Sequence, residues 1–242
     1  MEFCCKQKGL KNVLLSYHST QAMTSPIEEN YLKALFKLKN EDGKVTISEL
    51  SKKLKVSMPS VNSMVKNLQK KGMIYYEKYK PIELTEKGKK TAALVIRKHR
   101  LTEMYLVEKM GFGWEEVHAI AEQIEHIDSP AFFERMDKLL NHPTIDPHGS
   151  PIPDKQGVVA DLALKPLSAY PKGTKVKLMA LANSSTQFLD FLNSRDLKLG
   201  KKLKIVSVED YDRSMVVNYE GHNAESLSAM VCERLLVEVV AE

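Results

Sequence analysis

Histidine and glutamate side chains recur at helical spacing between residues 99 and 126. His99 and Glu103 lie four residues apart in the run RKHRLTEMYLVEKM. The later run WEEVHAIAEQIEHID places His118, Glu122, Glu125 and His126 at such spacing. Residues three, four and seven apart share one face of a helix, so these four would form a single stripe. Imidazole and carboxylate groups bind divalent metals, but the spacing fits two solvated amphipathic helices with incidental histidines equally well.

Two helices are expected to carry these side chains. The first begins near Thr85 and runs to the break at Gly111-Phe112-Gly113, and the second spans Trp114 to Ile127. Ser129-Pro130 predicts the start of a further helix, AFFERMDKLLN. The following run, NHPTIDPHGSPIPDKQG, has no period and is rich in Pro and Gly, so it is expected to be a loop or linker. Its two histidines, His142 and His148, are expected at the surface rather than as ligands.

Residues 23–95 contain a different pattern. Ser25 and Pro26 predict the start of a helix that ends at Asp42-Gly43. Two short amphipathic helices follow, joined by a turn through Lys55-Val56, and the second begins with small polar residues. Such a pair is typical of a helix-turn-helix. The run MIYYEKYKPIELTEKG then alternates around a Pro-containing turn, which predicts a two-stranded wing.

This segment is also strongly basic, because 15 lysines outnumber 8 acidic residues. A surplus of positive charge suits a polyanion such as double-stranded DNA, although winged helices also dock on proteins. We expect the start of the second helix to face base edges through Ser57, Pro59, Ser60, Asn62 and Ser63. We expect phosphate contacts from Lys66, Lys70, Lys78 and Lys80. Because the base-facing side chains are short, affinity would depend on the phosphates and fall steeply with salt.

The last part of the chain changes character near Lys165. Four β-rich runs, KVKLMAL, KLKIVSVEDY, SMVVNYEG and LLVEVVA, surround one helical run, STQFLDFLNSRD. That pattern predicts a small β-barrel with a helical insert. The expected fold class is therefore a mainly α N-terminal two-thirds followed by a small β-barrel domain. The expected divisions are an extension at 1–22, a winged helix-turn-helix at 23–95, a helical domain with its linker at 96–160, and the barrel at 165–242.

Composition narrows the class of protein. The chain has 242 residues, of which 43% are hydrophobic and 28% are charged, as in ordinary soluble globular proteins. No apolar run approaches the roughly 18 residues that would span a bilayer, and the first 22 residues lack a signal-peptide pattern. Three cysteines, Cys4, Cys5 and Cys232, have no metal-ligand spacing. We therefore expect a cytoplasmic protein without a membrane segment.

Taken in order, several motifs resemble the diphtheria-toxin-repressor and manganese-transport-regulator family of metal-activated transcription repressors. The resemblance runs from about Met23 to the C-terminus and rests on MTSPIEENYLKALF, VSMPSVNSMVKNL, LTEKGKK, RKHRLTEMYL, VHAIAEQIEHIDSP and DPHGSPIPD. It implies a winged helix, a helical metal-binding and dimerisation domain, and an SH3-like C-terminal domain of the FeoA type. It also implies a homodimer that binds a palindromic operator and represses genes of metal-ion uptake.

The resemblance further implies two metal sites. His99, Glu103 and His118 match one site, to which the last domain would add Gln187, while the usual acidic companion is replaced by Ser184. The other site would be formed by Glu122, Glu125 and His126 together with Asn30. Manganese-type members have an acidic ligand at the position of Asn30, and Lys33 follows one turn later, so Glu28 or Glu29 could assist.

The residue at position 122 bears on the choice of metal. Iron-responsive members often carry Cys there, and a carboxylate in place of a thiolate favours harder ions. We therefore expect Mn²⁺, with Fe²⁺ as the second choice. Zn²⁺, Co²⁺, Ni²⁺ or Cd²⁺ could substitute in vitro.

Two other interpretations are compatible with the residues. In the first, the chain is a winged-helix regulator whose His/Glu face is a dimer surface without metal sensing. In the second, the cluster is the centre of a metal-dependent hydrolase. The inverted zinc-protease motif H-x-x-E-H has Glu122 in place of its first His here, and no nucleophile lies beside it, so the second is disfavoured.

Overall fold

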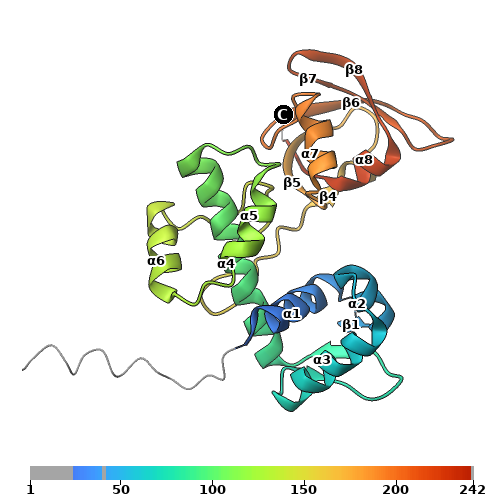
Figure 1. Ribbon diagram of the computed structural model, residues 1–242. Coiled ribbons are helices and arrows are strands. Elements are labelled where there is room, and N and C mark those ends of the chain that lie inside the picture. Colours follow the sequence, from blue (N-terminus) through green and yellow to red (C-terminus); the bar gives the residue numbers. More distant parts are fainter. Residues whose placement is uncertain (1–23, 40–41, 241–242) are drawn as a thin grey trace, which may run out of the picture.

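The computed structural model describes residues 24–39 and 42–240, and the extension expected at 1–22, with Cys4 and Cys5, lies outside them (Figure 1). The first unit contains α1 (Pro26–Leu38), α2 (Ile47–Leu54) and α3 (Met58–Lys70). Ser25 and Thr46 each accept a hydrogen bond from the third residue of the helix that follows, and Glu28 and Glu49 bond back to the capping residues. These capping boxes explain where α1 and α2 begin.

The wing is part of a three-stranded sheet rather than the two-stranded hairpin expected. Strand β1 (Lys44–Val45) pairs with β3 (Ile82–Leu84), which pairs in turn with β2 (Ile74–Tyr75). The additional strand has two residues, too few to show an alternating pattern. Its Val45 is buried in the core that α1, α2 and α3 share with the wing.

A long helix connects this unit to the next. Helix α4 (Glu86–Met110) has 25 residues and crosses the boundary expected at residue 95. Helices α5 (Val117–Ile124) and α6 (Pro130–Leu139) follow it and pack against it. Gly111 ends α4 in the left-handed conformation, with a φ of 74°, which favours glycine.

The helix expected from Trp114 to Ile127 is shorter in the structure. Trp114 precedes α5 and packs against the core of the C-terminal domain, while the backbone N–H of Glu116 bonds to the Gly113 carbonyl in a turn. At the other end, the N–H of Ile127 bonds to Ile124, so Glu125 and His126 lie in a turn after the helix. Local packing and the approaching Ser129-Pro130 therefore override the helical period at both ends.

The C-terminal unit is a six-stranded antiparallel sheet with helices against it. The strands are β4 (Lys165–Pro166), β5 (Lys175–Leu181), β6 (Lys202–Val208), β7 (Met215–Tyr219), β8 (His222–Leu227) and β9 (Leu235–Val239), in the spatial order β4-β9-β5-β6-β7-β8. The helical elements are η1 (Leu167–Ala169), α7 (Thr186–Asn193) and α8 (Ala229–Arg234). The expected fold class is confirmed. Strand β8 was not expected, because its sequence HNAESL shows no apolar alternation. Helix α8 was not expected either.

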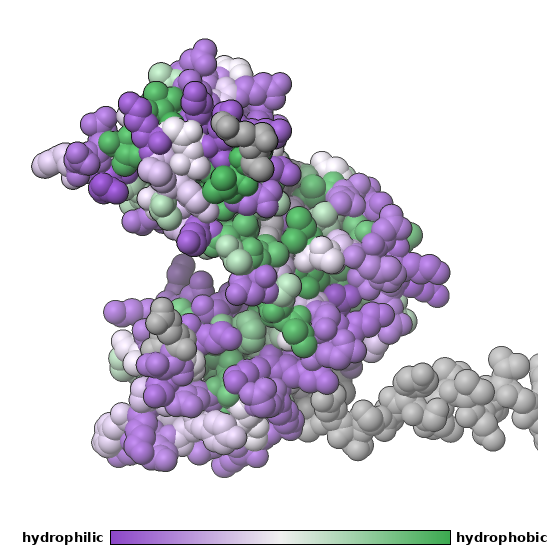
Figure 2. Space-filling model, turned by 180° about the vertical axis from the view of Figure 1, so that it is seen from behind, coloured by the Kyte–Doolittle hydropathy of each residue, from purple (hydrophilic) through white to green (hydrophobic). Residues whose placement is uncertain are grey.

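Apolar side chains are unevenly distributed over the surface of the molecule. Figure 2 shows apolar side chains gathered over the middle of the molecule, between two lobes with mostly hydrophilic surfaces. The large exposed apolar residues of the middle unit and its adjoining loop include Met110, Ile127, Phe132, Leu139, Ile145 and Val158. Within the part of the chain that the structure describes, no helix has the length and apolarity to cross a membrane.

Candidate metal centre

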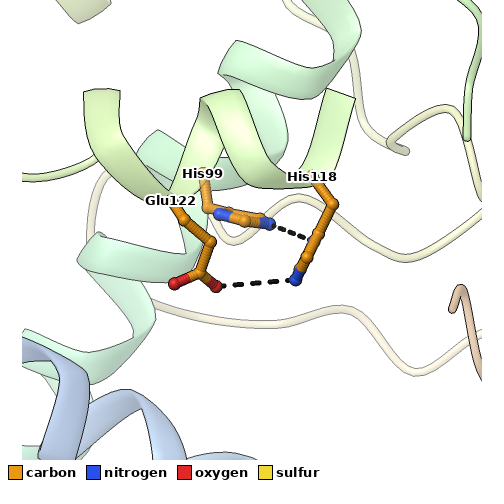
Figure 3. Close-up of side chains that lie close together, drawn as sticks. All are labelled: His99, His118 and Glu122. Carbon is orange, nitrogen blue, oxygen red and sulfur yellow. Dashed lines mark hydrogen bonds and ion pairs between the residues drawn. The ribbon is translucent and has the colours of Figure 1, made fainter. Parts of the chain in front are cut away.

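Apart from Gln187, the predicted ligands come from α1, α4, α5 and the turn after α5, which meet where the first two units join. His99 and Glu103 lie on α4, while His118 and Glu122 lie on α5. Glu125 and His126 follow α5, and α1 approaches with the side chains of Glu29, Asn30 and Lys33. In Figure 3, His99, His118 and Glu122 point toward one another from α4 and α5.

The first group is compact. The Nε2 atom of His99 lies 3.0 Å from Glu103 Oε1 and 3.1 Å from His118 Nδ1. His118 Nδ1 is 3.1 Å from the same Glu103 oxygen, and its Nε2 is 3.6 Å from Glu122 Oε1. His99 and Glu103 are buried, with 4% and 2% of their surface exposed. That burial excludes a solvated helix face for these two residues.

Contacts within this group shift the pKa values of Glu103 and His99. Burial disfavours ionisation of Glu103, but its hydrogen bonds with His118 and His99 outweigh that effect and hold its pKa below the usual range. Burial likewise disfavours the His99 cation, yet the bonds to Glu103 and Glu125 raise the pKa of that imidazole. His99 thus lies between the two carboxylates, with Nε2 toward Glu103 and Nδ1 toward Glu125.

The second group contacts the first through Glu125 and His99. Glu125 is completely buried, and its Oε2 lies 2.6 Å from His99 Nδ1. Its Oε1 lies 2.6 Å from the Nζ atom of Lys33, which also lies 2.7 Å from Glu122 Oε1. His99 thus connects Glu103 of one group to Glu125 of the other.

Two buried polar atoms in the second group have no hydrogen-bond partner among the described residues. They are Asn30 Oδ1 and His126 Nε2. His126 is oriented by its other ring nitrogen, Nδ1, which lies 2.6 Å from Glu29 Oε2. An unpartnered buried acceptor is costly, and an amide oxygen and an imidazole nitrogen are both metal donors. The residues present therefore fit a divalent cation.

Two residues that were not expected as ligands adjoin the first group. Asp146 and His148 offer ligand atoms that lie, with one from Glu103, within 4.8 Å of one another. His148 Nε2 lies 2.8 Å from the Trp114 carbonyl oxygen, so it carries the proton and leaves Nδ1 as a lone pair. That Nδ1 is 3.9 Å from Glu103 Oε2.

The expectation that His148 lies at the surface is wrong, because only 2% of it is exposed. The loop folds back onto β5, where the Leu181 N–H bonds to the His148 carbonyl. An added Cβ on Gly149 would lie 2.2 Å from the Met179 carbonyl oxygen, so only glycine permits this approach. The sequence offered one weak signal, an Asp and a His two residues apart. His142 is exposed, as expected, and pairs with Asp137.

Gln187 lies apart from the cluster. It is exposed on α7, and none of the hydrogen bonds or ion pairs found in the described chain joins it to the predicted ligands. The C-terminal domain instead contacts the start of α5 through Asn193. The Asn193 side chain accepts a hydrogen bond from Trp114 Nε1 at 2.8 Å and donates one to Glu115 Oε2 at 3.0 Å. A role for Gln187 as a ligand stays a prediction.

The residues expected to contact DNA are mostly exposed. Those on or beside α3 are Ser57, Pro59, Ser60, Ser63, Lys66 and Lys70, and those in the wing are Lys78 and Lys80. Asn62 is half-buried and engaged, since its amide donates to the Met58 carbonyl and its Oδ1 accepts from the Tyr76 hydroxyl. That engagement favours a role for Asn62 in holding the wing against α3.

Family comparisons match the two N-terminal units separately. Residues 23–82 match the family described as "Iron dependent repressor, N-terminal DNA binding domain". Residues 85–154 match "Iron dependent repressor, metal binding and dimerisation domain". All six predicted ligands on and after α4 and α5 fall within the second range.

Individual relatives agree with these matches. The chain is 35% identical over 157 residues to the iron-dependent repressor IdeR of Mycobacterium leprae (strain TN), covering 65% of this chain and 66% of that protein. The chain spans 54–66% of the length of the mycobacterial repressors that it matches.

Solved structures extend the similarity to the C-terminal unit. One, a manganese-dependent transcriptional repressor in complex with manganese, has a TM-score of 0.78 and 26% identity, over 88% of this chain and 100% of that one. Another, ScaR with bound Zn²⁺, has a TM-score of 0.74 and 30% identity, over 88% of this chain and 99% of that one. With the fold and the ligand cluster described above, these similarities show that the chain belongs to the diphtheria-toxin-repressor and manganese-transport-regulator family of metal-dependent transcriptional repressors.

Proposed function

We propose that this protein is a metal-activated, DNA-binding repressor of metal-uptake genes that responds to Mn²⁺, with Fe²⁺ as the second candidate. The observation that carries the proposal is the position of the ligand cluster. It joins α1 of the DNA-binding unit to α4 and α5 of the helical unit. Among the described residues, two of its buried donor atoms, Asn30 Oδ1 and His126 Nε2, have no hydrogen-bond partner, and the second lies 3.5 Å from Glu125 Oε1. A cation bound there would bind one arrangement of the two units better than another, as metal-dependent activation requires.

Two sets of residues would hold the ions. Glu122, Glu125, His126 and Asn30 would form one set, and His99, Glu103 and His118 the other, with Gln187 as a further donor. Asp146 and His148 adjoin Glu103 and could complete the second set. A divalent ion would neutralise carboxylate charge and hold these donors together. Glu122 supports Mn²⁺ as the physiological ion, because a carboxylate is a harder ligand than a thiolate.

The chain itself provides the connection from this cluster to the DNA-binding surface. Glu29, Asn30 and Lys33 face the cluster from α1, whereas Glu28 on the same helix binds α3. The Glu28 carboxylate accepts a hydrogen bond from Asn67 Nδ2 at 2.7 Å and pairs with Lys71 Nζ. A shift of α1 would therefore be transmitted to α3 through a partly buried ionic contact.

Two copies of the whole chain would act as a homodimer. The exposed apolar residues of the middle unit supply a surface of the kind that dimers bury, and its family description includes dimerisation. Two α3 helices at fixed spacing would then match the half-sites of a palindromic operator in double-stranded DNA.

The two alternatives have less support. The family consists of DNA-binding repressors and not of enzymes, and no nucleophile lies beside Glu122, so a hydrolase is disfavoured. A regulator without metal sensing would leave the buried Asn30 and His126 donors unexplained.

DNA binding measured with and without metal tests the proposal. Fluorescence anisotropy with fragments of promoters of metal-uptake genes should show tight binding with Mn²⁺ and loss of binding with EDTA. Glu122→Ala and Glu103→Ala should each weaken the metal-dependent binding, while Glu86→Ala, a change at an exposed carboxylate, should not. Equal affinity for DNA in EDTA and in Mn²⁺ would contradict the proposal.

A further inference from the structure

A lysine ammonium occupies the carboxylates of one predicted metal site. Lys33 Nζ lies 2.7 Å from Glu122 Oε1 and 2.6 Å from Glu125 Oε1. Lys33 is only 6% exposed although lysine is ordinarily a surface residue, and Glu125 is completely buried. The three residues form a closed ionic contact between α1 and the end of α5.

Loss of Lys33 or Glu125 from this contact would be costly, because the other would remain buried. A buried ammonium is tolerated only beside compensating negative charge, and removing one member of a buried pair leaves the other uncompensated. Both carboxylates therefore have a counter-ion in the absence of metal, supplied by the chain itself. The contact explains how this acidic cluster can be buried without a bound cation.

We propose that Lys33 competes with the divalent metal for Glu122 and Glu125, and so lowers the metal affinity of the site and sets the concentration at which the protein responds. The proposal rests on the proposed function, since it concerns the same ligands. An ammonium and a divalent cation repel each other and cannot both contact the same two oxygens. The other oxygen of Glu125, Oε2, is already held by His99 at 2.6 Å, so a metal that binds Glu125 Oε1 requires Lys33 to leave.

The position of Lys33 links this exchange to α1. It lies one turn after Asn30, so the same helix contributes both a donor to the metal and its competitor. In the structure, Lys33 holds α1 against α5 alongside the contact of Glu29 with His126. When a metal displaces Lys33, Asn30 would take over its part of the contact, and Glu29 would stay bound to His126. The two states thus differ in which part of α1 is held.

Metal titration of the full-length protein tests the competition. Free Mn²⁺ measured by electron paramagnetic resonance should give a dissociation constant at least about tenfold lower for Lys33→Gln than for the wild type, because the repulsion and the competing ion pair are gone. Lys33→Arg keeps the positive charge and should stay close to the wild type.

Lys39→Gln is the matched control. It removes the same charge at the C-cap of the same helix, and the exposed Lys39 lies over the Phe36 ring, with no ion pair to Glu122 or Glu125 found within 4 Å in the described chain. It should therefore change Mn²⁺ affinity much less than Lys33→Gln. Equal effects of the two substitutions would reduce the role of Lys33 to that of a general positive charge and would overturn the proposal.

A second measurement uses the unaltered protein and does not depend on the folding of a variant. Acetylation of lysine amines, read by mass spectrometry, should modify Lys33 slowly in EDTA and faster with Mn²⁺, because displacement exposes the amine. Modification of Lys33 that stays constant or falls as Mn²⁺ binds would contradict the proposal.

The outcomes separate this inference from the proposed function. If the wild type binds Mn²⁺ and DNA as proposed while Lys33→Gln has the wild-type Mn²⁺ affinity, only the competition fails. If Lys33→Gln binds Mn²⁺ and the wild type does not, the competition stands and the proposed metal response of this chain fails. If neither protein binds Mn²⁺, both fail.

Discussion

His126 is held by Glu29 across the junction of the first two units. Its Nδ1 lies 2.6 Å from Glu29 Oε2, although the two residues are 97 positions apart in the chain. A hydrogen bond at Nδ1 places the proton there and leaves the lone pair on Nε2, which has no hydrogen-bond partner and lies 3.5 Å from Glu125 Oε1, to bind the proposed metal. Glu29 is therefore a positioning residue for His126, contributed by α1.

Removing that carboxylate should weaken metal binding. Because partners that orient a ligating histidine typically contribute 10–100-fold to affinity, we expect Glu29→Ala to raise the Mn²⁺ dissociation constant by about that factor. Glu77→Ala, which removes an exposed carboxylate in the wing, is the control. Wild-type Mn²⁺ affinity in Glu29→Ala would show that His126 needs no orienting partner.

The lysines of α3 should determine how salt affects DNA binding. Lys66 and Lys70 are exposed and have no ion pair among the contacts found in the described chain. If each contacts one phosphate, Lys66→Ala and Lys70→Ala should each reduce the slope of log affinity against log salt by about 1 and weaken binding to all sequences alike. Lys109→Ala, at the far end of α4, should leave the slope unchanged. The idea fails if the slopes of the α3 variants match that of the wild type.

The parts of the fold that follow local rules could be predicted from the sequence. Ser25, Thr46 and Ser57 cap their helices through their own side chains, so short polar residues before apolar periods were sufficient to locate the starts of α1, α2 and α3. The expected end of the first helix at Asp42-Gly43 is wrong, because α1 ends at Leu38. The His/Glu spacing likewise identified the side chains that meet between α4 and α5. The resemblance to the family, rather than the spacing, divided them into two sites.

The remaining features depend on contacts between distant segments. Lys33 and Glu125 are 92 positions apart, so no sequence window contains both. His148 is buried because a Pro-rich loop without a period packs against β5, which local composition cannot indicate. Strand β1 exists only because β3 lies beside it. Each of these features was missed for the same physical reason, namely that a partner far along the chain determines it.

Asp146 should stabilise the loop that carries His148. Its Oδ1 accepts hydrogen bonds from the N–H groups of His148 and Ser150, at 2.8 and 2.9 Å, and its Oδ2 lies 3.3 Å from Arg100 Nε. Because Asp146→Ala would leave the mostly buried Arg100 without its carboxylate, we expect a loss of about 3 kcal/mol in the free energy of unfolding. Urea denaturation in EDTA measures this loss without a contribution from metal.

Asp161→Ala provides the comparison for Asp146, since the exposed Asp161 carboxylate accepts one hydrogen bond from Ala163 in a local turn. Its loss should be within about 0.5 kcal/mol. Similar values for the two variants would show that Asp146 has no special structural role. A normal stability for Asp146→Ala combined with weaker Mn²⁺ binding would assign the residue to the metal instead.

Acid should weaken the link between α1 and α3 through Glu28. Burial opposes its ionisation, but hydrogen bonds from Lys71, the Ser25 N–H and Asn67 hold its pKa below the ordinary value of 4.5. A carboxyl group whose pKa is lower in the folded state stabilises the protein above the unfolded pKa, and that contribution is lost as pH falls through the folded pKa. Glu28→Gln should therefore cost about 1–3 kcal/mol at pH 7.

The cost should shrink as pH falls below about 4.5, because the unfolded wild type takes up the proton there first, and the contribution of the charge is lost once pH passes the lower folded pKa. Urea denaturation from about pH 7 to pH 3 would give both stability curves, which should converge toward acid. Glu86→Gln, at an exposed carboxylate paired with Lys89, should follow the wild type throughout. Curves for Glu28→Gln and the wild type that stay parallel would mean that neutral hydrogen bonding, and not the charge of Glu28, holds α3 to α1. In that case the ionic route from the cluster to the DNA-binding surface would be excluded.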